Sequence, residues 1–517
     1  MNMRENVMHI MNDKTNKEDI FIKAAADYDG FIILVSPFEV VLVEMEDTLR
    51  RCGIEVMSLH NGVEQTTRNS LLKDFANYTI NPQFILVNPC VMATDGLFEY
   101  CIRRRRDEFS LLIVDEAQCI SQWGMSFKPF YQRIPDFLNG VFEDEEQCTV
   151  MALTQSLNPK EIEDIREMFR IDKTGIVREE LPLRDDIELH IERLEREYEK
   201  EERFWNIVDK HKEEKMLVYV YREEKKTVIK SLFEKALERG YKAAYWDEDV
   251  DANKHKELVE KYHNGDVNLI FTKNVFGTGI DVQGINVVIH YMIPESLNQY
   301  YREIGRINRE STGQESKSSH AYLLYTPLNI DVKKREFIDD EFPCEQMVVG
   351  FYNTIGRRKG IKIFPYREND DIQSCLPYYV EAGISRVVGK GFSDLKVISD
   401  IKDQLIQKMY DGSNTKTFGR ILKDNDWSVK EIEDIVYGGF VDSQYTMNKP
   451  LKNWLVIDVV ENEITNARLK VVLVSISDKK KYKHEQLDEF IHLITKSDVN
   501  TTDLYQKVIT HLSEKKK

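Results

Sequence analysis

Short apolar runs alternate with charged, helix-forming stretches over about the first 328 residues of the chain. This pattern is typical of parallel α/β sheets, because strands that are buried on both faces read as continuous apolar runs. The runs of the first block are Phe31–Val35, Phe84–Val87, Leu111–Val114 and Val150–Leu153. The runs of the second block are Met216–Val220, Ala243–Tyr245, Leu269–Phe271, Val287–His290 and Ala321–Tyr325. We therefore expect two separate parallel-sheet domains.

The highly charged segment Ile187–Arg203 lies between the two blocks. We interpret it as a strand that passes into a solvated helix at the domain junction. The predicted domains are accordingly residues 1–184 and residues 185–328.

The alternation fades after these two blocks. Residues Ser374–Val388 predict a helix, a glycine turn and a strand, as in a small winged-helix domain, which we place at residues 329–400. Residues 401–517 predict a further α+β region whose role the pattern does not assign. The elements expected within it are a helical stretch, Ile401–Tyr437, and two strands, Trp454–Val459 and Leu469–Ile476.

The composition changes this picture little. Hydrophobic residues make up 42% of the chain and charged residues 31%, an ordinary balance for a globular protein. The formal net charge of -17 disfavours non-specific adhesion to DNA or anionic membranes, but it leaves room for a strand held in one local groove. No apolar run approaches the roughly 20 residues of a membrane span, and the first residues lack the pattern of a secretory signal. We expect no membrane partner, and a cytoplasmic location, or a nuclear one if the source is eukaryotic.

The segment Leu111–Tyr131 (LLIVDEAQCISQWGMSFKPFY) carries the most chemical information. Its apolar strand ends in Asp115 and Glu116, which places two carboxylates at the edge of a parallel sheet where ligands bind. Asp115 could hold Mg²⁺ against nucleotide phosphates, and Glu116 could deprotonate an attacking water. In isolation, a strand end with incidental acids would be the better interpretation of this pair.

The residues that follow closely resemble the RecQ helicase family, in which a DEAH motif runs into CISQWG and then an aromatic, a basic residue, a proline and a tyrosine. The resemblance implies two RecA-like domains, and it implies that Trp123, Phe127 and Lys128 contact single-stranded DNA. Stacking on aromatic rings is a common way of holding bases. Gln118 stands where the family has its catalytic histidine, and a Met-Ser pair replaces His-Asp in the loop, which puts the strength of coupling in doubt.

Further motifs extend this resemblance over about residues 5–325. VSPFEVVLVEME resembles a strand-binding motif centred on Ser36, and MALTQSL resembles the family's third motif with Thr154 retained. The second block contains FGTGIDVQG followed by GRINR, similar to motifs V and VI. The resemblance assigns Gly279 and Asp281 to the nucleotide and Arg306 and Arg309 to arginine fingers that reach the γ-phosphate. A solvated helix face is the alternative for the two arginines.

The phosphate loop is where the sequence departs from the family. Such a motor needs a glycine-rich loop followed by Lys and Ser or Thr, whereas VMHIMNDKT has no glycine. We interpret this stretch as a shortened loop in which Lys14 and Thr15 would contact ATP and its Mg²⁺ and Asp13 would repel the phosphates. That Lys14 is only a surface lysine is an equally good interpretation.

The run Arg103–Arg106 could touch a phosphate backbone, although a solvated helix end is the better interpretation. The family often carries a four-cysteine zinc platform, but Cys344 and Cys375 stand alone and the seven cysteines form no CxxC pair. We expect no zinc at those cysteines, and the spacing of the histidines indicates no ligand set.

The leading hypothesis is a RecQ-like, DNA-dependent ATPase and 3′-to-5′ helicase that uses ATP and Mg²⁺ in DNA repair or recombination. Its partner would be single-stranded or partly duplex DNA, and protein partners are unknown. The alternative is a non-catalytic, helicase-like protein that binds nucleic acid or a partner. A missing N-terminal segment that carried the true phosphate loop is a third explanation of the same sequence.

Overall fold

The computed structural model describes most of the chain. The described residues are 5–12, 15–60, 62–121, 129–142, 148–155, 157–180, 186–220, 228–246, 252–272, 284–307, 319–356, 358–365, 371–390, 394–397, 429–442, 445–449 and 454–495.

The first sheet is parallel throughout and has the strand order β3-β4-β2-β5-β6-β1-β7. Its strands are β1 (Val7–Met11), β2 (Phe31–Val35), β3 (Val56–Ser58), β4 (Phe84–Val87), β5 (Phe109–Val114), β6 (Thr149–Gln155) and β7 (Ile176–Arg178). Its helices are α1 (Lys17–Asp27), α2 (Glu39–Arg51), α3 (Gln65–Ala76), α4 (Pro89–Thr94), α5 (Gly96–Arg104), α6 (Ile134–Phe142) and α7 (Pro159–Met168). The four strands predicted for this block are confirmed, with β5 and β6 longer than expected.

Alternate residues of one strand pack into different cores, which explains the continuous apolar runs. In β2, Ile32 and Leu34 belong to one core cluster, whereas Ile33 and Val35 belong to another. All four side chains are fully buried. Both faces of the first sheet are therefore covered, as a parallel sheet flanked by helices requires.

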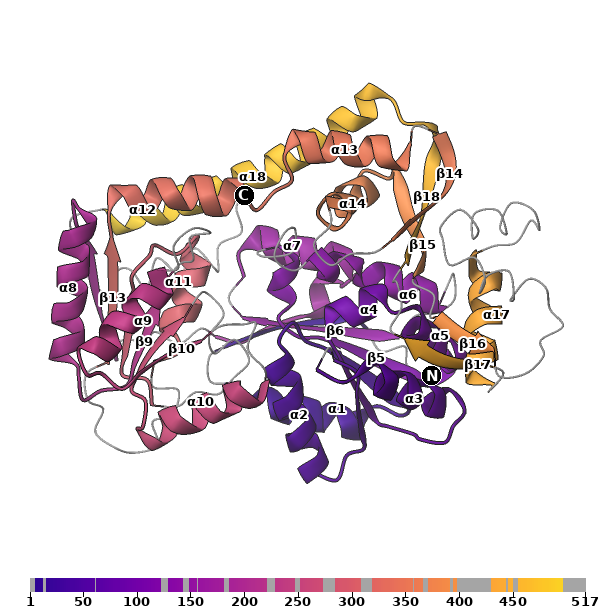
Figure 1. The fold of residues 1–517 in the computed structure, drawn as a ribbon, viewed down its shortest axis with the longest axis horizontal. Helices are drawn as coiled ribbons and strands as arrows, with labels where there is room; N and C mark the ends of the chain where they lie inside the picture. The colour runs from indigo at the N-terminus through magenta and orange to yellow at the C-terminus, as the bar shows by residue number, and fades with distance from the viewer. Residues whose placement is uncertain are drawn as a thin grey trace.

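The second sheet is also parallel, with the order β10-β11-β9-β12-β13-β8. Its strands are β8 (Ile187–Arg193), β9 (Met216–Tyr219), β10 (Ala243–Trp246), β11 (Leu269–Thr272), β12 (Val287–His290) and β13 (Ser319–Tyr325). Its helices are α8 (Glu197–Lys210), α9 (Val228–Glu238), α10 (Ala252–Asn264) and α11 (Leu297–Ile304). The strand and helix predicted within the charged junction are confirmed as β8 and α8, and Figure 1 shows the two sheets as separate bodies.

The C-terminal part adds small sheets and helices. Its elements are α12 (Pro327–Val332), a π-helix (Lys333–Asp339), α13 (Glu345–Ile355), β14 (Arg358–Pro365), α14 (Asp371–Glu381), β15 (Ser385–Lys390), β16 (Asp394–Val397), α17 (Val429–Val441), β17 (Tyr445–Lys449), β18 (Trp454–Glu463) and α18 (Asn466–Ile494). Helix α14, the turn at Gly383 and strand β15 match the predicted helix, turn and strand. Strand β18 lies between β14 and β15, so one antiparallel sheet draws strands from both sides of the predicted boundary at residue 400.

The predicted strand Leu469–Ile476 is wrong, because these residues form part of helix α18. Val472 and Ile476 are buried one helical turn apart, whereas Val471 and Val474 are exposed. Burial that recurs at this spacing is the signature of a helix with one apolar face. The density of β-branched residues in the stretch had favoured a strand.

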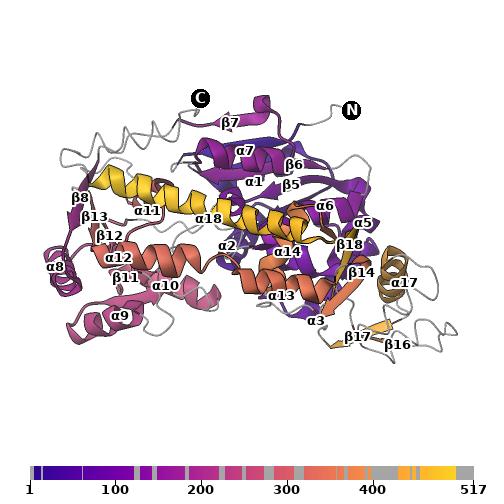
Figure 2. The same cartoon turned by 90° about the horizontal axis from the view of Figure 1, so that it is seen from above.

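Helix α18 bridges the two parallel sheets (Figures 1 and 2). The Phe490 ring lies 5.3 Å from the ring of Tyr300 in α11, beside the second sheet. The Tyr482 hydroxyl accepts a hydrogen bond of 2.6 Å from the side chain of Asn158, which caps α7 beside the first sheet. A direct contact between the sheets' helices adds to this bridge, since Asn298 of α11 donates to the Glu161 carboxylate of α7 at 2.8 Å. No helix within the described part of the chain is both long and apolar enough to cross a membrane.

Candidate nucleotide-binding site

Two acids lie at the carboxyl end of β5, as the sequence predicts. Asp115 is almost fully buried, and its Oδ2 accepts a hydrogen bond of 3.0 Å from the Ser36 hydroxyl. The Tyr131 hydroxyl donates to the Asp115 carbonyl at 2.7 Å, which fixes the backbone at this point. Glu116 adopts a left-handed backbone conformation, with φ 51° and ψ 45°. Non-glycine residues held in this region cluster at functional sites, because surrounding contacts must maintain the strain.

Lys17 supplies the positive charge between these two acids. Its Nζ lies 2.7 Å from Asp115 Oδ1 and 2.5 Å from Glu116 Oε1. Burial alone would lower the pKa of Lys17, but the two carboxylates outweigh it and raise that pKa, so the ammonium stays charged. Burial raises the pKa of Asp115 above its ordinary value, whereas the pKa of Glu116 is lowered because the charge of Lys17 outweighs the effect of burial.

Lys17 is therefore a site residue that the sequence reasoning missed. It is the first residue of α1, and the loop 12–16 joins this helix to β1, which lies beside β6 in the sheet. A strand, a loop and a helix that begins with a lysine form the arrangement that binds phosphates in P-loop proteins. The local signal was Asn16, whose side chain caps α1 by accepting from the Glu18 N–H at 3.0 Å. The predicted phosphate ligand, Lys14, lies outside the described residues.

A carboxylate from elsewhere in the chain occupies the loop. Glu179, which follows β7, accepts a hydrogen bond of 3.0 Å from the backbone N–H of Asn12. It also accepts from the Thr15 hydroxyl, and the His9 ring nitrogen lies 2.8 Å from its other oxygen. Burial opposes the charge of Glu179, but these contacts outweigh burial and lower its pKa. The Thr15 hydroxyl, which the sequence predicts to contact ATP and Mg²⁺, thus donates a hydrogen bond to the Glu179 carboxylate.

Gln118 links Glu116 to the strand of the third motif. Its side-chain NH₂ donates to Glu116 Oε2, and its side-chain oxygen accepts a hydrogen bond of 2.8 Å from the Thr154 hydroxyl at the end of β6. Both Gln118 and Thr154 are buried. The chain of contacts holds the Glu116 carboxylate in one orientation.

Arg306 approaches the acids from the second sheet. It follows α11 and is 7% exposed, and its charge is among the causes that lower the pKa of Glu116. The structure therefore brings together five of the predicted residues: Asp115, Glu116, Gln118, Thr154 and Arg306.

The remaining predicted residues differ in outcome. The sequence assigns Ser36 to a nucleic-acid strand; in the structure its side chain is fully buried and donates a hydrogen bond to Asp115, and the contact with a strand stays a prediction. The other predicted site residues fall outside the described part of the chain: Lys14, Trp123, Phe127, Lys128, Gly279, Asp281 and Arg309.

The basic run at the end of α5 contains both an exposed arginine, Arg104, and a buried one, Arg105. Arg103 pairs with Asp434 of α17, and Arg104 lies 3.3 Å from Asp442, just beyond that helix. The guanidinium of Arg105 is buried, bonds to Glu108 and lies 4.4 Å from the centre of the Phe75 ring. Arg103 and Arg104 thus attach the C-terminal part to the first domain, whereas the contacts of Arg105 lie within that domain.

The chain matches two family models and several curated relatives. The DEAD/DEAH box helicase model matches residues 14–165, and the helicase conserved C-terminal domain model matches residues 199–311. The ATP-dependent DNA helicase RecQ of Bacillus subtilis is 27% identical over 342 residues, which are 64% of this chain and 53% of the relative. RecQ of a Synechocystis species is 24% identical over 282 residues, 54% of this chain and 58% of the relative. The chain contains the two domains of a DEAD/DEAH box helicase and is similar to RecQ-type superfamily-2 helicases. It spans between half and three-fifths of the length of these two relatives.

Two solved helicase structures have lower sequence identity with this chain than the two RecQ relatives have. Yeast Dbp5 bound to RNA and ADP BeF3 has a TM-score of 0.48 and 16% identity, covering 64% of this chain and 81% of that chain. The Mycobacterium smegmatis helicase Lhr bound to single-stranded DNA and AMP-PNP has a TM-score of 0.47 and 14% identity, covering 68% of this chain and 49% of that chain. The two parallel sheets and their strand orders carry the assignment of the RecA-like fold.

Proposed function

We propose that this chain is an ATP-dependent DNA motor, a RecQ-like 3′-to-5′ helicase that acts in repair or recombination. The observation that carries the proposal is the contact of Lys17 with Asp115 and Glu116 at the carboxyl edge of the first sheet. The charge of Arg306 acts on the same cluster from the second sheet. In this family the two RecA-like domains close over the nucleotide that is hydrolysed.

The residues of this cluster suit ATP and Mg²⁺. Carboxylate oxygens are the ligands that Mg²⁺ prefers, and Asp115 presents a buried carboxylate whose charge is balanced by Lys17. Mg²⁺ bound with ATP would neutralise charge on the transferred phosphate. Lys17 would bind the phosphates, and Glu116, oriented by Gln118, would accept the proton of the attacking water. Arg306, together with Arg309, would stabilise negative charge on the γ-phosphate.

Glu179 limits how well this site takes up ATP. Phosphates would have to displace its carboxylate from the Asn12 N–H and the Thr15 hydroxyl before those groups could serve a nucleotide. Loss of one preorganised donor of this kind costs about 2.7–4 kcal/mol in other enzymes. The motor is therefore expected to bind ATP weakly and to hydrolyse it slowly.

The proposal of a DNA partner rests on the resemblance of Trp123, Phe127 and Lys128 to the residues that contact single-stranded DNA in the RecQ family. Trp123 and Phe127 would stack on bases and Lys128 would contact phosphate, in single-stranded or partly duplex DNA. Stacking contributes roughly 1–3 kcal/mol per base. The double variant Trp123→Ala with Phe127→Ala should therefore weaken single-strand binding and the stimulation of ATPase while the thermal midpoint stays near that of the wild type. Unchanged DNA affinity in the folded double variant would remove these aromatics from the DNA site.

A non-catalytic, helicase-like binding protein is the second candidate. The observation that favours it is the contact of the Glu179 carboxylate with Asn12 and Thr15, together with the absence of glycine from the described residues between β1 and α1. Under this hypothesis the two-domain body would bind nucleic acid or a protein partner without turnover.

A steady-state ATPase assay with and without single-stranded DNA separates the two candidates. We expect slow turnover that DNA stimulates and that Glu116→Gln and Arg306→Gln each abolish. The matched control is Glu180→Gln, an exposed acid next to the loop, which should leave turnover unchanged. No turnover in the wild type, with DNA binding intact, would establish the non-catalytic candidate.

A further inference from the structure

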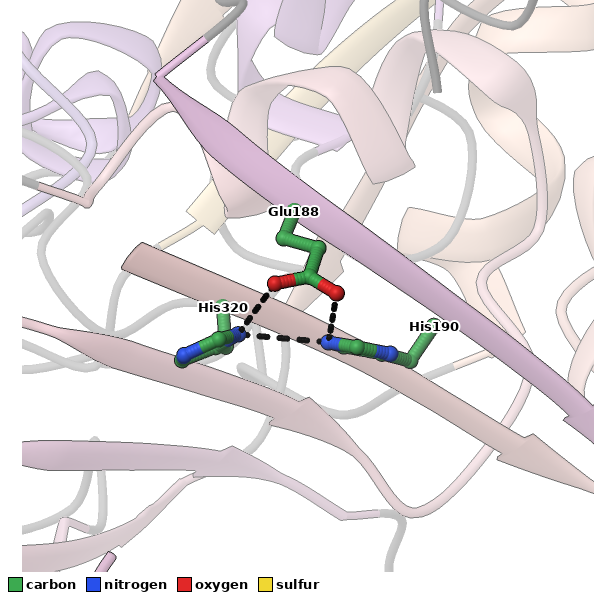
Figure 3. Close-up of side chains that lie close together, drawn as sticks. All are labelled: Glu188, His190 and His320. Carbon is green, nitrogen blue, oxygen red and sulfur yellow. Dashed lines mark hydrogen bonds and ion pairs between the residues drawn. The ribbon is translucent and has the colours of Figure 1, made fainter. Parts of the chain in front are cut away.

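Three potential metal ligands converge at the edge of the second sheet, far from the acid cluster in sequence and on a different sheet (Figure 3). Glu188 and His190 lie on the edge strand β8, and His320 lies on its neighbour β13. In the parallel register, His320 is opposite Glu188, and Tyr322 is opposite His190. Residues two apart on a strand share a face, so the three side chains project on the same side of the sheet.

The distances between the ligand atoms match those around a tetrahedral zinc ion. His190 Nε2 lies 3.2 Å from His320 Nδ1. Glu188 Oε1 lies 3.6 Å from His190 Nε2, and Glu188 Oε2 lies 3.4 Å from His320 Nδ1. Zinc ligands about 2.05 Å from the ion lie roughly 3.3 Å apart, since the edge of a tetrahedron is about 1.6 times its centre-to-corner distance. The two histidine nitrogens are thus separated by about the edge of such a tetrahedron, and each has one of the two Glu188 oxygens at a similar distance.

We propose that Glu188, His190 and His320 bind a zinc ion. Imidazole nitrogen with one carboxylate oxygen is a ligand set that suits Zn²⁺, whereas Mg²⁺ and Ca²⁺ prefer oxygen alone. The Glu188 side chain is 58% exposed, which leaves the fourth position open to water. The site is distinct from the zinc platform of cysteines that the sequence argues against at Cys344 and Cys375.

Aromatic neighbours hold the histidine rings in place. The Tyr322 ring stacks on His190, with centroids 4.4 Å apart and planes at 12°. The His211 ring lies 4.9 Å from that of His320, and its Nε2 is 3.0 Å from the Tyr322 hydroxyl. Lys210, a nearby cation, is directed to the same hydroxyl at 3.5 Å rather than to a ligand atom. Rings positioned in this way lose little freedom when they bind a metal.

The role of such an ion is structural. It would join strands that are 130 residues apart in sequence and would fasten the edge strand β8 to the rest of its sheet. Strand pairing forms the ligand set only in the folded chain, so the binding free energy of the ion should add to the stability of the fold. The pairing of β8 with β13 brings the three ligands together, which explains why the spacing of the histidines in the sequence did not predict a metal site.

Zinc binding to the tag-free full chain tests the proposal. After treatment with EDTA, the protein would be titrated with Zn²⁺ in competition with a chromophoric chelator, in a Cys52→Ser/Cys344→Ser background that removes the two exposed thiols. We expect one equivalent of tightly bound zinc. His190→Ala and His320→Ala should each weaken binding by more than the roughly 10–100-fold that loss of a supporting partner costs. His263→Ala, which removes an exposed histidine of α10, should leave binding unchanged.

A thermal scan keeps the test informative if a histidine variant folds poorly. Zn²⁺ should raise the Tm of the wild type, because a ligand that binds only the folded state stabilises it. Glu188→Gln changes an exposed side chain, so its Tm in EDTA should equal that of the wild type while its response to Zn²⁺ is reduced. Binding that is equally tight in Glu188→Gln, His190→Ala and His320→Ala, or no stoichiometric binding to the wild type, would show that the three side chains form only a cross-strand polar contact.

Discussion

The Glu179 carboxylate accepts a hydrogen bond of 3.0 Å from the backbone N–H of Asn12, in the loop where a P-loop protein binds phosphate. The two residues are 167 positions apart, and the pairing of β7 with β1 brings them together. Backbone N–H groups ahead of a helix form an anion site, and here an internal anion fills it. A nucleotide bound at this loop would therefore have to compete with Glu179 for the Asn12 N–H.

Glu179→Gln should raise the affinity for ATP by about tenfold, which corresponds to roughly 1.4 kcal/mol. The amide keeps the size of the side chain but removes the charge that repels phosphate. Binding of a fluorescent ATP analogue, measured at one ionic strength, would show the change, and Glu180→Gln is the matched control. Equal affinity in the two variants would mean that Glu179 does not compete with phosphate.

The same substitution should make stability depend less on pH. The pKa of Glu179 is lowered in the folded protein from an ordinary value of 4.5, so its carboxylate stabilises the fold above about pH 4.5. This contribution is lost as the pH falls through the lower, folded pKa. The difference in Tm between wild type and Glu179→Gln should be largest near neutral pH and should shrink in acid. A difference that stays constant across this range would contradict the lowered pKa.

Lys17→Ala should abolish nucleotide binding and destabilise the protein by about 3–5 kcal/mol, because it leaves two buried carboxylates without their shared cation. Adding Asp115→Asn should recover part of that stability. Urea unfolding measures the stability, and the fluorescent analogue measures binding.

Lys14→Ala is the comparison that decides between the two lysines. Loss of nucleotide binding in Lys14→Ala, with binding retained in Lys17→Ala, would return the phosphate contact to the residue predicted from the sequence. Retention in Lys14→Ala with loss in Lys17→Ala is the expected result.

Asn158→Ala should cost about 0.5–2 kcal/mol, because it removes both the cap of α7 and the bond to Tyr482. Tyr482→Phe keeps the cap and removes only the hydroxyl, so it should cost about 0.5–1.5 kcal/mol. Chemical denaturation of both variants and of the double variant would apportion the effect. Full additivity of the two changes would mean that the contact between α18 and α7 does not contribute to stability.

The parallel sheets were predictable because burial on both faces leaves a strong local signal. Phe31–Val35 and Val287–His290 match their strands without adjustment. Asp115 and Glu116 were predictable for a related reason, since a strand that ends in acids places them at the edge where ligands bind. These inferences need only the chain around each residue.

What could not be predicted depends on contacts between distant segments. Glu179 meets Asn12 through β7, a strand of three residues whose pattern is too short to detect. The choice between Lys14 and Lys17 depends on the residue at which α1 begins. The ends of helices and strands are what a sequence pattern predicts least well. The pairing of Arg103 with Asp434 likewise needed the position of α17.

Helix α18 connects the two parallel-sheet domains through contacts with each. Its 29 residues extend over roughly 43 Å, and it is attached to α7 through Tyr482 and to α11 through Phe490. A helix of fixed length that contacts both domains allows them to rotate relative to each other, but it resists a change in the distance between them. If the two domains open and close when ATP is hydrolysed, this helix must either move with one domain or lose one of these two contacts. The C-terminal part would then sense, as mechanical tension, whether the two domains are open or closed.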